Sequence, residues 1–179
     1  MARQKDLYIQ ALRGLAISAV VLIHALPQSE YSLLVRPFLN WGVALFLFIS
    51  GLLSPEPRFA SGGGVVRNRL VKVLVPYVLW SIAYFLLLGN GDPLSLLKGL
   101  LTGGCAAQLY YLLVYAQLVV LTPWFYGMLR RHRVLMYSVT PTALFLREVL
   151  GVFGLSVPHL ASLFPVWLVY YLMGLDWGR

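Results

Sequence analysis

The stretch LYIQALRGLAISAVVLIHAL, residues 7–26, decides the fold class. It is mainly apolar and about 20 residues long, which is the length that an α-helix needs to cross the hydrocarbon core of a bilayer. Arg13 lies inside the stretch, and no small-residue cleavage pattern follows Pro27. Both features argue against a cleaved signal peptide. We therefore expect residues 7–26 to form a retained membrane-spanning helix.

The composition of the whole chain is that of a membrane protein. Of its 179 residues 60% are hydrophobic and 11% are charged, and the mean hydropathy is +0.79. This is more apolar surface than a water-soluble core can hide, and the many aromatic residues exclude a disordered chain. The net charge is +8, but the basic residues form short clusters between apolar stretches, so we expect no nucleic-acid partner. The single cysteine, Cys105, excludes an intramolecular disulfide and a multi-cysteine metal site.

Six segments fit the template of a spanning helix. They are residues 7–26, 38–53, 71–88, 108–129, 134–153 and 160–175. The second is short and the fifth contains Pro141, Arg147 and Glu148, so these two fit less well. Short breakers rich in glycine and proline separate the segments and leave no room for a soluble domain. The predicted fold is all-α, a single polytopic transmembrane bundle of about six helices over residues 1–179.

The basic residues of the connecting segments predict the orientation of this bundle. Arg36 and Lys98 fall on one side of the membrane, and ten others fall on the opposite side. Those ten are Arg3, Lys5, Arg58, Arg67, Arg69, Lys72, Arg130, Arg131, Arg133 and Arg179. Because short loops rich in Lys and Arg stay in the cytoplasm, we expect both termini there and a multi-pass protein of a cell membrane.

Arg13 and His24 are the polar groups of the first predicted span that most require an explanation, since such residues are costly in a membrane. Eleven residues separate them, so both project from one helix face with an axial offset of about 16 Å. One interpretation is a polar groove in which Arg13 holds an anionic group and His24 moves a proton. The alternative is that Arg13 snorkels to the head groups and His24 lies at the outer interface.

A second basic cluster, Arg67, Arg69 and Lys72, lies at the edge of the third predicted helix. In a helix Arg69 and Lys72 are neighbours at i and i+3 and form a doubly positive patch. Such a patch suits a phosphate or pyrophosphate, which the glycines of residues 62–64 would allow to approach closely. The alternative, which the residues alone favour, is that the cluster only fixes topology.

Arg147 and Glu148 are adjacent charges on the fifth segment. Adjacent helix positions point about 100° apart, so we expect each side chain to seek a partner on another helix rather than its neighbour. Glu148 is then a candidate carboxylate partner for His24. The alternative is that the helix ends near Leu146 and leaves both charges at the outer interface. The sequence contains no phosphate-binding loop, dinucleotide glycine pattern, zinc-site spacing or hydrolase serine motif, and we expect no metal.

Several ordered motifs resemble the acyltransferase-three family, membrane enzymes that O-acylate bacterial surface sugars and related small molecules. The Arg and His of residues 8–24 resemble the family's opening helix, and GVALFLFISG at 42–51 is similar to its Phe-rich stretch ending in Ser-Gly. The segment RLVKVLVPY at 69–77 resembles its basic segment followed by Pro-Tyr, and LYYLL at 109–113, LTP at 121–123 and YYLMG at 170–174 follow in the expected order. Lys72 stands where the family commonly has a second Arg, and Ala44 replaces a residue that is often polar.

The resemblance implies transfer of an acyl group, expected to be acetyl, from cytoplasmic acyl-CoA to a hydroxyl of a sugar or surface glycan. It implies that His24 is the general base and that Arg13 orients His24 or stabilises negative charge on the carbonyl oxygen. Arg67, Arg69 and Lys72 would face the phosphates of acyl-CoA, which is a co-substrate, so no permanently bound cofactor is expected. A prokaryotic inner membrane is the implied location.

Relatives have more membrane helices than the six expected here, so residues 1–179 would correspond to the N-terminal portion of such a domain. A partner chain or an oligomer would then complete the bundle. Two alternatives from other functional classes stay open. One is a small transport component for a polar metabolite or lipid-linked sugar, with Arg13, His24, Arg147 and Glu148 along the route. The other is a non-catalytic remnant that only packs with other helices.

Overall fold

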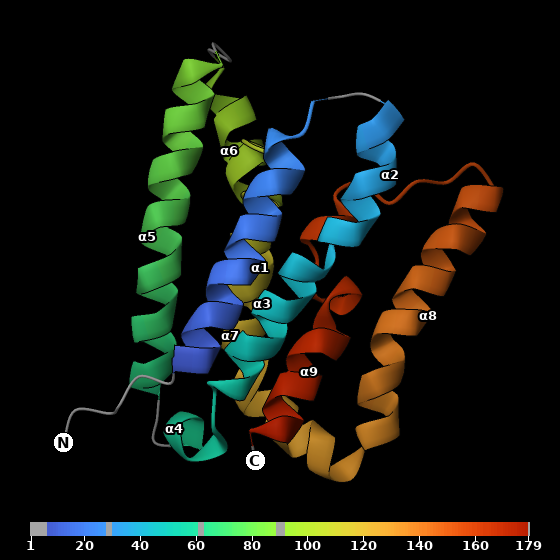
Figure 1. Cartoon of the computed structure of the whole chain (residues 1–179). Helices are drawn as coiled ribbons and strands as arrows, with labels where there is room; N and C mark the ends of the chain where they lie inside the picture. The colour runs from blue at the N-terminus through green and yellow to red at the C-terminus, as the bar shows by residue number, and fades with distance from the viewer. Residues whose placement is uncertain (1–6, 28–29, 61–62, 89–91, 179) are drawn as a thin grey trace.

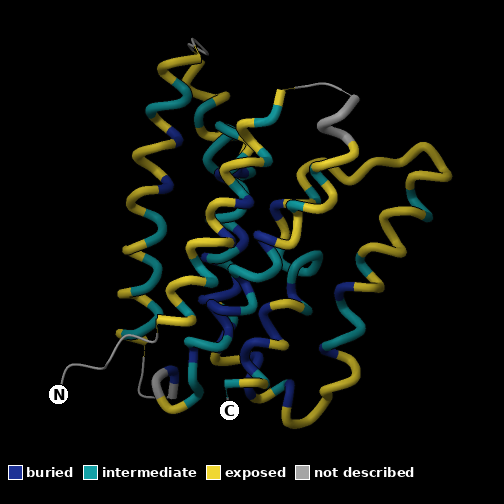
Figure 2. The backbone as a smooth tube through the Cα atoms, viewed as in Figure 1, coloured by how far each residue is buried: buried dark blue, intermediate teal, exposed yellow. Residues whose placement is uncertain are grey.

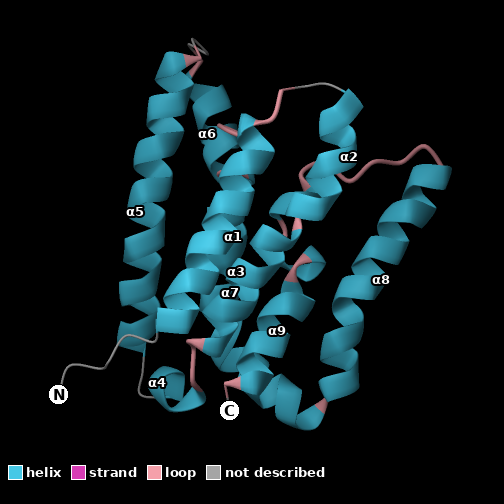
Figure 3. Ribbon diagram, viewed as in Figure 1, coloured by secondary structure: helices cyan, strands magenta, loops and turns pink. Residues whose placement is uncertain are grey.

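The computed structural model describes residues 7–27, 30–60, 63–88 and 92–178, and within them every regular element is helical (Figure 3). Three residues of the orientation argument, Arg3, Lys5 and Arg179, lie outside these ranges. The elements are α1 (Leu7–Ala25), α2 (Glu30–Leu39), α3 (Trp41–Leu52), α4 (Glu56–Ala60), α5 (Gly63–Leu87), α6 (Pro93–Thr102), α7 (Tyr110–Arg131), α8 (Arg133–Val152), two 3₁₀ turns (Leu160–Ser162 and Phe164–Val166) and α9 (Leu168–Trp177).

The long helices run side by side and alternate in direction along the chain (Figure 1). The start of α1, the start of α5, the α7–α8 turn and the end of α9 lie at one end of the bundle. This end, called the basic end below, carries Arg67, Arg69 and Lys72 as well as the arginines of the α7–α8 turn. The helices that hold Arg36 and Lys98 lie at the opposite end.

Four helical stretches are long and apolar enough to cross a membrane: Leu7–Ala25, Leu34–Leu52, Gly63–Leu87 and Tyr110–Arg131. They coincide with the first four predicted segments, although α5 begins eight residues earlier than expected, at Gly63 rather than at residue 71. Large apolar side chains on the outer surface of these helices are exposed, as a lipid environment requires. In Figure 2 the buried residues gather where α3, α7 and α9 meet, and exposed residues follow the outer faces of α5 and α8.

The last two predicted segments differ from the other four. The helix α8 covers the fifth segment, but it is less apolar than the four candidate spans. A continuous helix over residues 160–175 is wrong, because Pro165, which cannot donate a backbone hydrogen bond, lies in the second of two 3₁₀ turns. Gln117 of α7 holds these turns through bonds of 2.7 Å to Ser162 O and 3.0 Å from Phe164 N. The α9 helix that remains is about 15 Å long, about half of a hydrocarbon core.

The short helix α6 is absent from the sequence prediction but begins and ends at recognisable signals. Asp92 caps its N-terminus by accepting a bond of 3.2 Å from the Leu94 N–H, and Pro93 follows at the first helical position. Gly103 ends the helix with a φ of 74°, in the left-handed region that favours glycine. Its Lys98 and Thr102 face away from the core, since no residue of α6 is buried.

Two glycines bring α3 and α9 into close contact. A Cβ built on Gly51 would collide with the backbone of Tyr171, and a Cβ built on Gly174 would collide with the backbone of Phe48. The two helices therefore pack backbone to backbone, as small residues permit between membrane helices. Gly51 and Gly174 are the last residues of the family-like motifs at 42–51 and 170–174. Part of that sequence pattern is therefore explained by the contact between α3 and α9. Around it lies a core that includes Leu47, Leu118, Phe125, Tyr171 and Leu175.

Candidate active site

A cavity of about 540 Å³ opens between α1, α3, α5 and α7. This Arg13 cavity is lined by Gln10, Arg13, Gly14, Ile17, Phe46, Ser50, Val73, Tyr111, Leu112 and Tyr115. The Arg13 side chain is half-buried, and its Nε is buried with no hydrogen-bond partner among the described residues. The Arg13 side chain lines the cavity, and its charged guanidinium is suited to an anionic or carbonyl-bearing ligand.

A second, smaller cavity of about 100 Å³ adjoins the first. Its lining is apolar and consists of Ile17, Val20, Val21, Val43, Phe46 and Tyr111. Three of these residues, Ile17, Phe46 and Tyr111, also line the Arg13 cavity. The smaller cavity, called the apolar chamber below, therefore continues the Arg13 cavity along α1 in the direction of His24.

The residues of α1 that line the two cavities share one face with His24. Arg13, Ile17, Val20 and Val21 recur at helical spacing, and His24 is three residues beyond Val21. The helix is continuous from Leu7 to Ala25, so the expected axial offset of about 16 Å between Arg13 and His24 is retained. Reacting atoms must approach to about 3–3.5 Å. In this conformation the two side chains therefore act on different parts of any bound ligand.

A positive charge on another helix acts on His24. Arg36 of α2 is close enough for its positive charge to act on His24, and α2 packs against the end of α1. The Nε of Arg36 is buried and, like that of Arg13, has no partner among the described residues. The sequence predicts only a topology role for Arg36, because nothing in it shows that α2 packs against α1. His24 itself is exposed at the end of α1.

Arg69 points into the bundle rather than toward solvent. It donates bonds of 2.5 Å to Ser54 Oγ and 2.6 Å to Leu53 O, and its guanidinium lies over the ring of Phe59, 5.0 Å from the centroid. Lys72 and Arg67 are exposed on the same helix. The structure therefore separates the predicted cluster into one internal arginine and two free surface cations.

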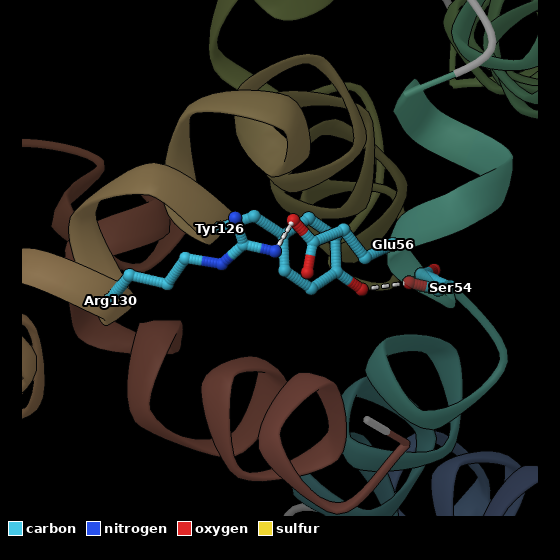
Figure 4. Close-up of polar contacts among 4 residues, drawn as sticks. All are labelled: Ser54, Glu56, Tyr126 and Arg130. Atoms are coloured by element: carbon cyan, nitrogen blue, oxygen red, sulfur yellow. Dashed lines mark hydrogen bonds and ion pairs between the residues drawn. The ribbon is translucent and has the colours of Figure 1, made fainter.

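Ser54 is fully buried and joins four parts of the fold. Tyr126 of α7 donates to Ser54 O (Figure 4), and Tyr171 of α9 lies 3.4 Å from Ser54 Oγ. The hydroxyl of Tyr171 is also 2.7 Å from that of Thr122. An ion pair of 2.5 Å between Arg130 and Glu56 closes the outside of this region (Figure 4). These contacts hold the α3–α4 junction against α5, α7 and α9 at the basic end.

The Ser54 network lies next to the Arg13 cavity. Ser54 Oγ donates a bond of 2.6 Å to the carbonyl of Ser50, which lines the cavity one turn away. On α5 the same one-turn step separates Arg69 from Val73, another lining residue. Arg69 is thus placed at the edge of the cavity that faces the basic end.

Glu148 is not brought together with His24. It lies exposed on α8, and α3 and α9 stand between α1 and α8 in Figure 1. The expectation that Arg147 and Glu148 do not pair with each other is wrong, since Arg147 Nε is 3.6 Å from Glu148 Oε1. The side chains of Arg147 and Glu148 are long and exposed, with 61% and 76% of their surfaces accessible. They can therefore bend toward each other although their Cα–Cβ bonds point about 100° apart.

The sequence also has a match among models of protein families. Residues 6–179 match the model of the acyltransferase-three family, described as an acyltransferase domain. No curated protein and no solved structure matches the chain. The family match covers all described residues, including α1 with Arg13 and His24, and agrees with four apolar helices able to cross a membrane. The chain is therefore a multi-pass membrane protein that belongs to the acyltransferase-three family.

Proposed function

We propose that the protein transfers a short acyl group, acetyl in the first instance, from cytoplasmic acyl-CoA to a hydroxyl of a sugar or surface glycan. The observation that carries this proposal is the order of three features along one face of α1: the Arg13 cavity, then the apolar chamber, then His24. This series is called the row below. The family implies acyl transfer in general. The row supplies what that reaction needs: a binding cavity, an apolar space and a base.

The donor enters from the basic end in this proposal. Lys72 and Arg67 are exposed there. The Lys72 ammonium is a compact positive charge, and the Arg67 guanidinium donates several hydrogen bonds from one plane, so both neutralise the phosphates of acyl-CoA. Arg69 supports this region from inside through Ser54 and Leu53. The narrow chain that links the phosphates of the donor to its thioester then lies in the Arg13 cavity, where the Arg13 guanidinium donates to one of its carbonyl oxygens.

The chemistry takes place at the opposite end of the row. His24 removes the proton from the acceptor hydroxyl, whose oxygen attacks the thioester carbonyl carbon; the carbon–sulfur bond then breaks, and CoA leaves as a thiolate that takes up a proton. General-base catalysis of this kind contributes about 10²–10⁴-fold. We assign to Arg36, whose positive charge acts on His24, the stabilisation of the negative charge that develops on the carbonyl oxygen.

The row also accounts for transfer across the bilayer. The basic end faces the cytoplasm by the positive-inside rule, and His24 is at the other end of α1. A donor bound from the cytoplasm and an acceptor bound from outside would then meet near His24 of a bacterial inner-membrane protein. The exposed apolar outer face of α5, with Val71, Val75 and Leu79, is suited to lipid or to further helices of a larger bundle.

The experiment is acyl transfer by the purified chain in lipid nanodiscs. Acetyl-CoA labelled on the acetyl group is supplied with a glycan extract as acceptor, and the native protein is compared with His24→Ala and with Lys98→Gln, an outward basic residue away from the row. We expect label transfer in the native protein and in Lys98→Gln, and its loss in His24→Ala. Equal transfer with and without His24, or no transfer by a well-folded native sample, would overturn the proposal.

A further inference from the structure

The apolar chamber offers a site that neither the motifs nor the family match assigns. Its six lining side chains, Ile17, Val20, Val21, Val43, Phe46 and Tyr111, border a space of about 100 Å³ and present almost no polar atoms. The chamber is open on its outer side, where Ile17 and Val21 are exposed. A space of this kind does not favour water, which needs two to four polar partners. We propose that the chamber binds the acyl chain of the donor and restricts the enzyme to short acyl groups. The inference rests on the acyl transfer proposed above.

The chamber lies where the acyl group would be transferred from the donor to the acceptor. Ile17, Phe46 and Tyr111 line both the chamber and the Arg13 cavity, so the chamber lies directly beside a ligand bound in that cavity. Val21 lies three residues before His24 on the same face of α1, which is a rise of about 5 Å. An acetyl group held against Val21 therefore has its carbonyl carbon about one helical turn from His24.

The volume of the chamber limits what it holds. An apolar cavity of about 150 Å³ takes a six-carbon ring such as benzene. A chamber of about 100 Å³ correspondingly takes about two to four carbons. Acetyl to butyryl groups fit within this limit, and a hexanoyl chain exceeds it.

The helices beside the chamber are closely packed, and its wall side chains have little freedom to rotate. Beside Val43, a Cβ built on Gly42 would lie 2.9 Å from Ala16 O and 2.9 Å from Ala19 Cβ, so α1 and α3 are already at closest approach there. The ring of Phe46 packs edge-on against Tyr111 with centroids 5.3 Å apart. Valine side chains are also restricted at χ1. A longer acyl chain therefore cannot be admitted simply by rotating a side chain of the wall.

Two substitutions at Val43 test the inference in opposite directions. Val43→Ala enlarges the chamber, and Val43→Ile reduces it. The control is Val114→Ala, the same truncation at a buried position of α7 that lines neither cavity. For each protein, kcat/KM is measured with acetyl-, butyryl- and hexanoyl-CoA in nanodiscs, and thermal unfolding confirms that each variant is folded.

We expect Val43→Ala to raise the hexanoyl-to-acetyl ratio of kcat/KM by about tenfold or more, since one methylene in an apolar pocket discriminates by about 10–200-fold. Val43→Ile should lower the butyryl-to-acetyl ratio, and Val114→Ala should leave both ratios unchanged. Acetyl transfer that persists while neither Val43 variant changes its ratio would overturn the chamber assignment and leave the proposed function intact. Absence of His24-dependent transfer from every acyl-CoA would overturn both.

Discussion

The guanidinium of Arg69 donates a hydrogen bond of 2.5 Å to the buried hydroxyl of Ser54. This bond holds α5 against the end of α3. Ser54 also accepts hydrogen bonds from Tyr126 of α7 and Tyr171 of α9. An arginine that the family resemblance assigns to ligand phosphates thus has an internal function in the fold. In the proposed function it supports the donor site by holding the edge of the Arg13 cavity.

Arg69→Lys tests this internal function. Lysine keeps the charge but cannot donate two parallel hydrogen bonds from a planar fork, so the bonds to Ser54 and Leu53 are not both replaced. We expect the free energy of unfolding to fall by about 1–3 kcal/mol, measured as a lower Tm in nanodiscs. Lys72→Gln, at an exposed position one turn away, should change it by less than about 0.5 kcal/mol. An unchanged Tm for Arg69→Lys with a raised KM for acyl-CoA would instead place the guanidinium on the donor.

Gly51→Ala and Gly174→Ala test the contact between α3 and α9. In each variant the added methyl meets backbone atoms of the other helix, which cannot rotate away, so we expect a loss of about 3 kcal/mol, at the upper end of the overpacking range. Gly127→Ala is the control, because a methyl group added at Gly127 has no other atom within 4 Å. It should stabilise α7 by about 0.5–1 kcal/mol. Comparable Tm values for all three variants would show that α3 and α9 are not in close contact.

Arg36→Gln tests the placement of Arg36 beside His24. Removing one donor to a developing oxyanion typically costs about 10²–10³-fold in kcat, so we expect kcat to fall by about 10² while the KM for acyl-CoA stays within about threefold. Lys98→Gln, which removes the other predicted outward basic charge, should leave both constants unchanged. If Arg36→Gln raises KM and leaves kcat unaltered, Arg36 binds a substrate and does not stabilise the transition state.

The first four spans could be predicted from sequence because length and hydropathy determine them locally. The helical period likewise placed Arg13 and His24 on one face of the first span, and the structure retains this face on α1. The break at residues 160–167 was missed because Pro165 and the bonds from Gln117 outweigh an apolar composition. The signals that bound α6, Asp92-Pro93 and Gly103, were present, but ten residues are too few for a hydropathy template.

The relationships between helices could not be predicted. Sequence alone does not show that Gly51 faces α9, that Arg69 turns inward to Ser54, or that α2 brings Arg36 to His24, since each depends on which helices pack together. The same limit explains the candidate pair of His24 and Glu148. Their helices are separated by α3 and α9 in the bundle (Figure 1), a fact that no spacing along the chain contains.

The central claim is that, on one face of α1, Arg13 binds the donor and His24 acts as the general base. Separate measurement of donor affinity and single-turnover rate tests this claim most directly. In nanodiscs, the Kd for acetyl-CoA and the rate of acetyl transfer at saturating donor are compared for the native protein, Arg13→Gln and His24→Asn. We predict that Arg13→Gln raises the Kd by about tenfold, the cost of one lost charge-assisted hydrogen bond, with a nearly normal rate. We predict that His24→Asn keeps the Kd and lowers the rate by about 10²–10⁴-fold. Loss of the same quantity in both variants, or a native rate in His24→Asn, would contradict the account.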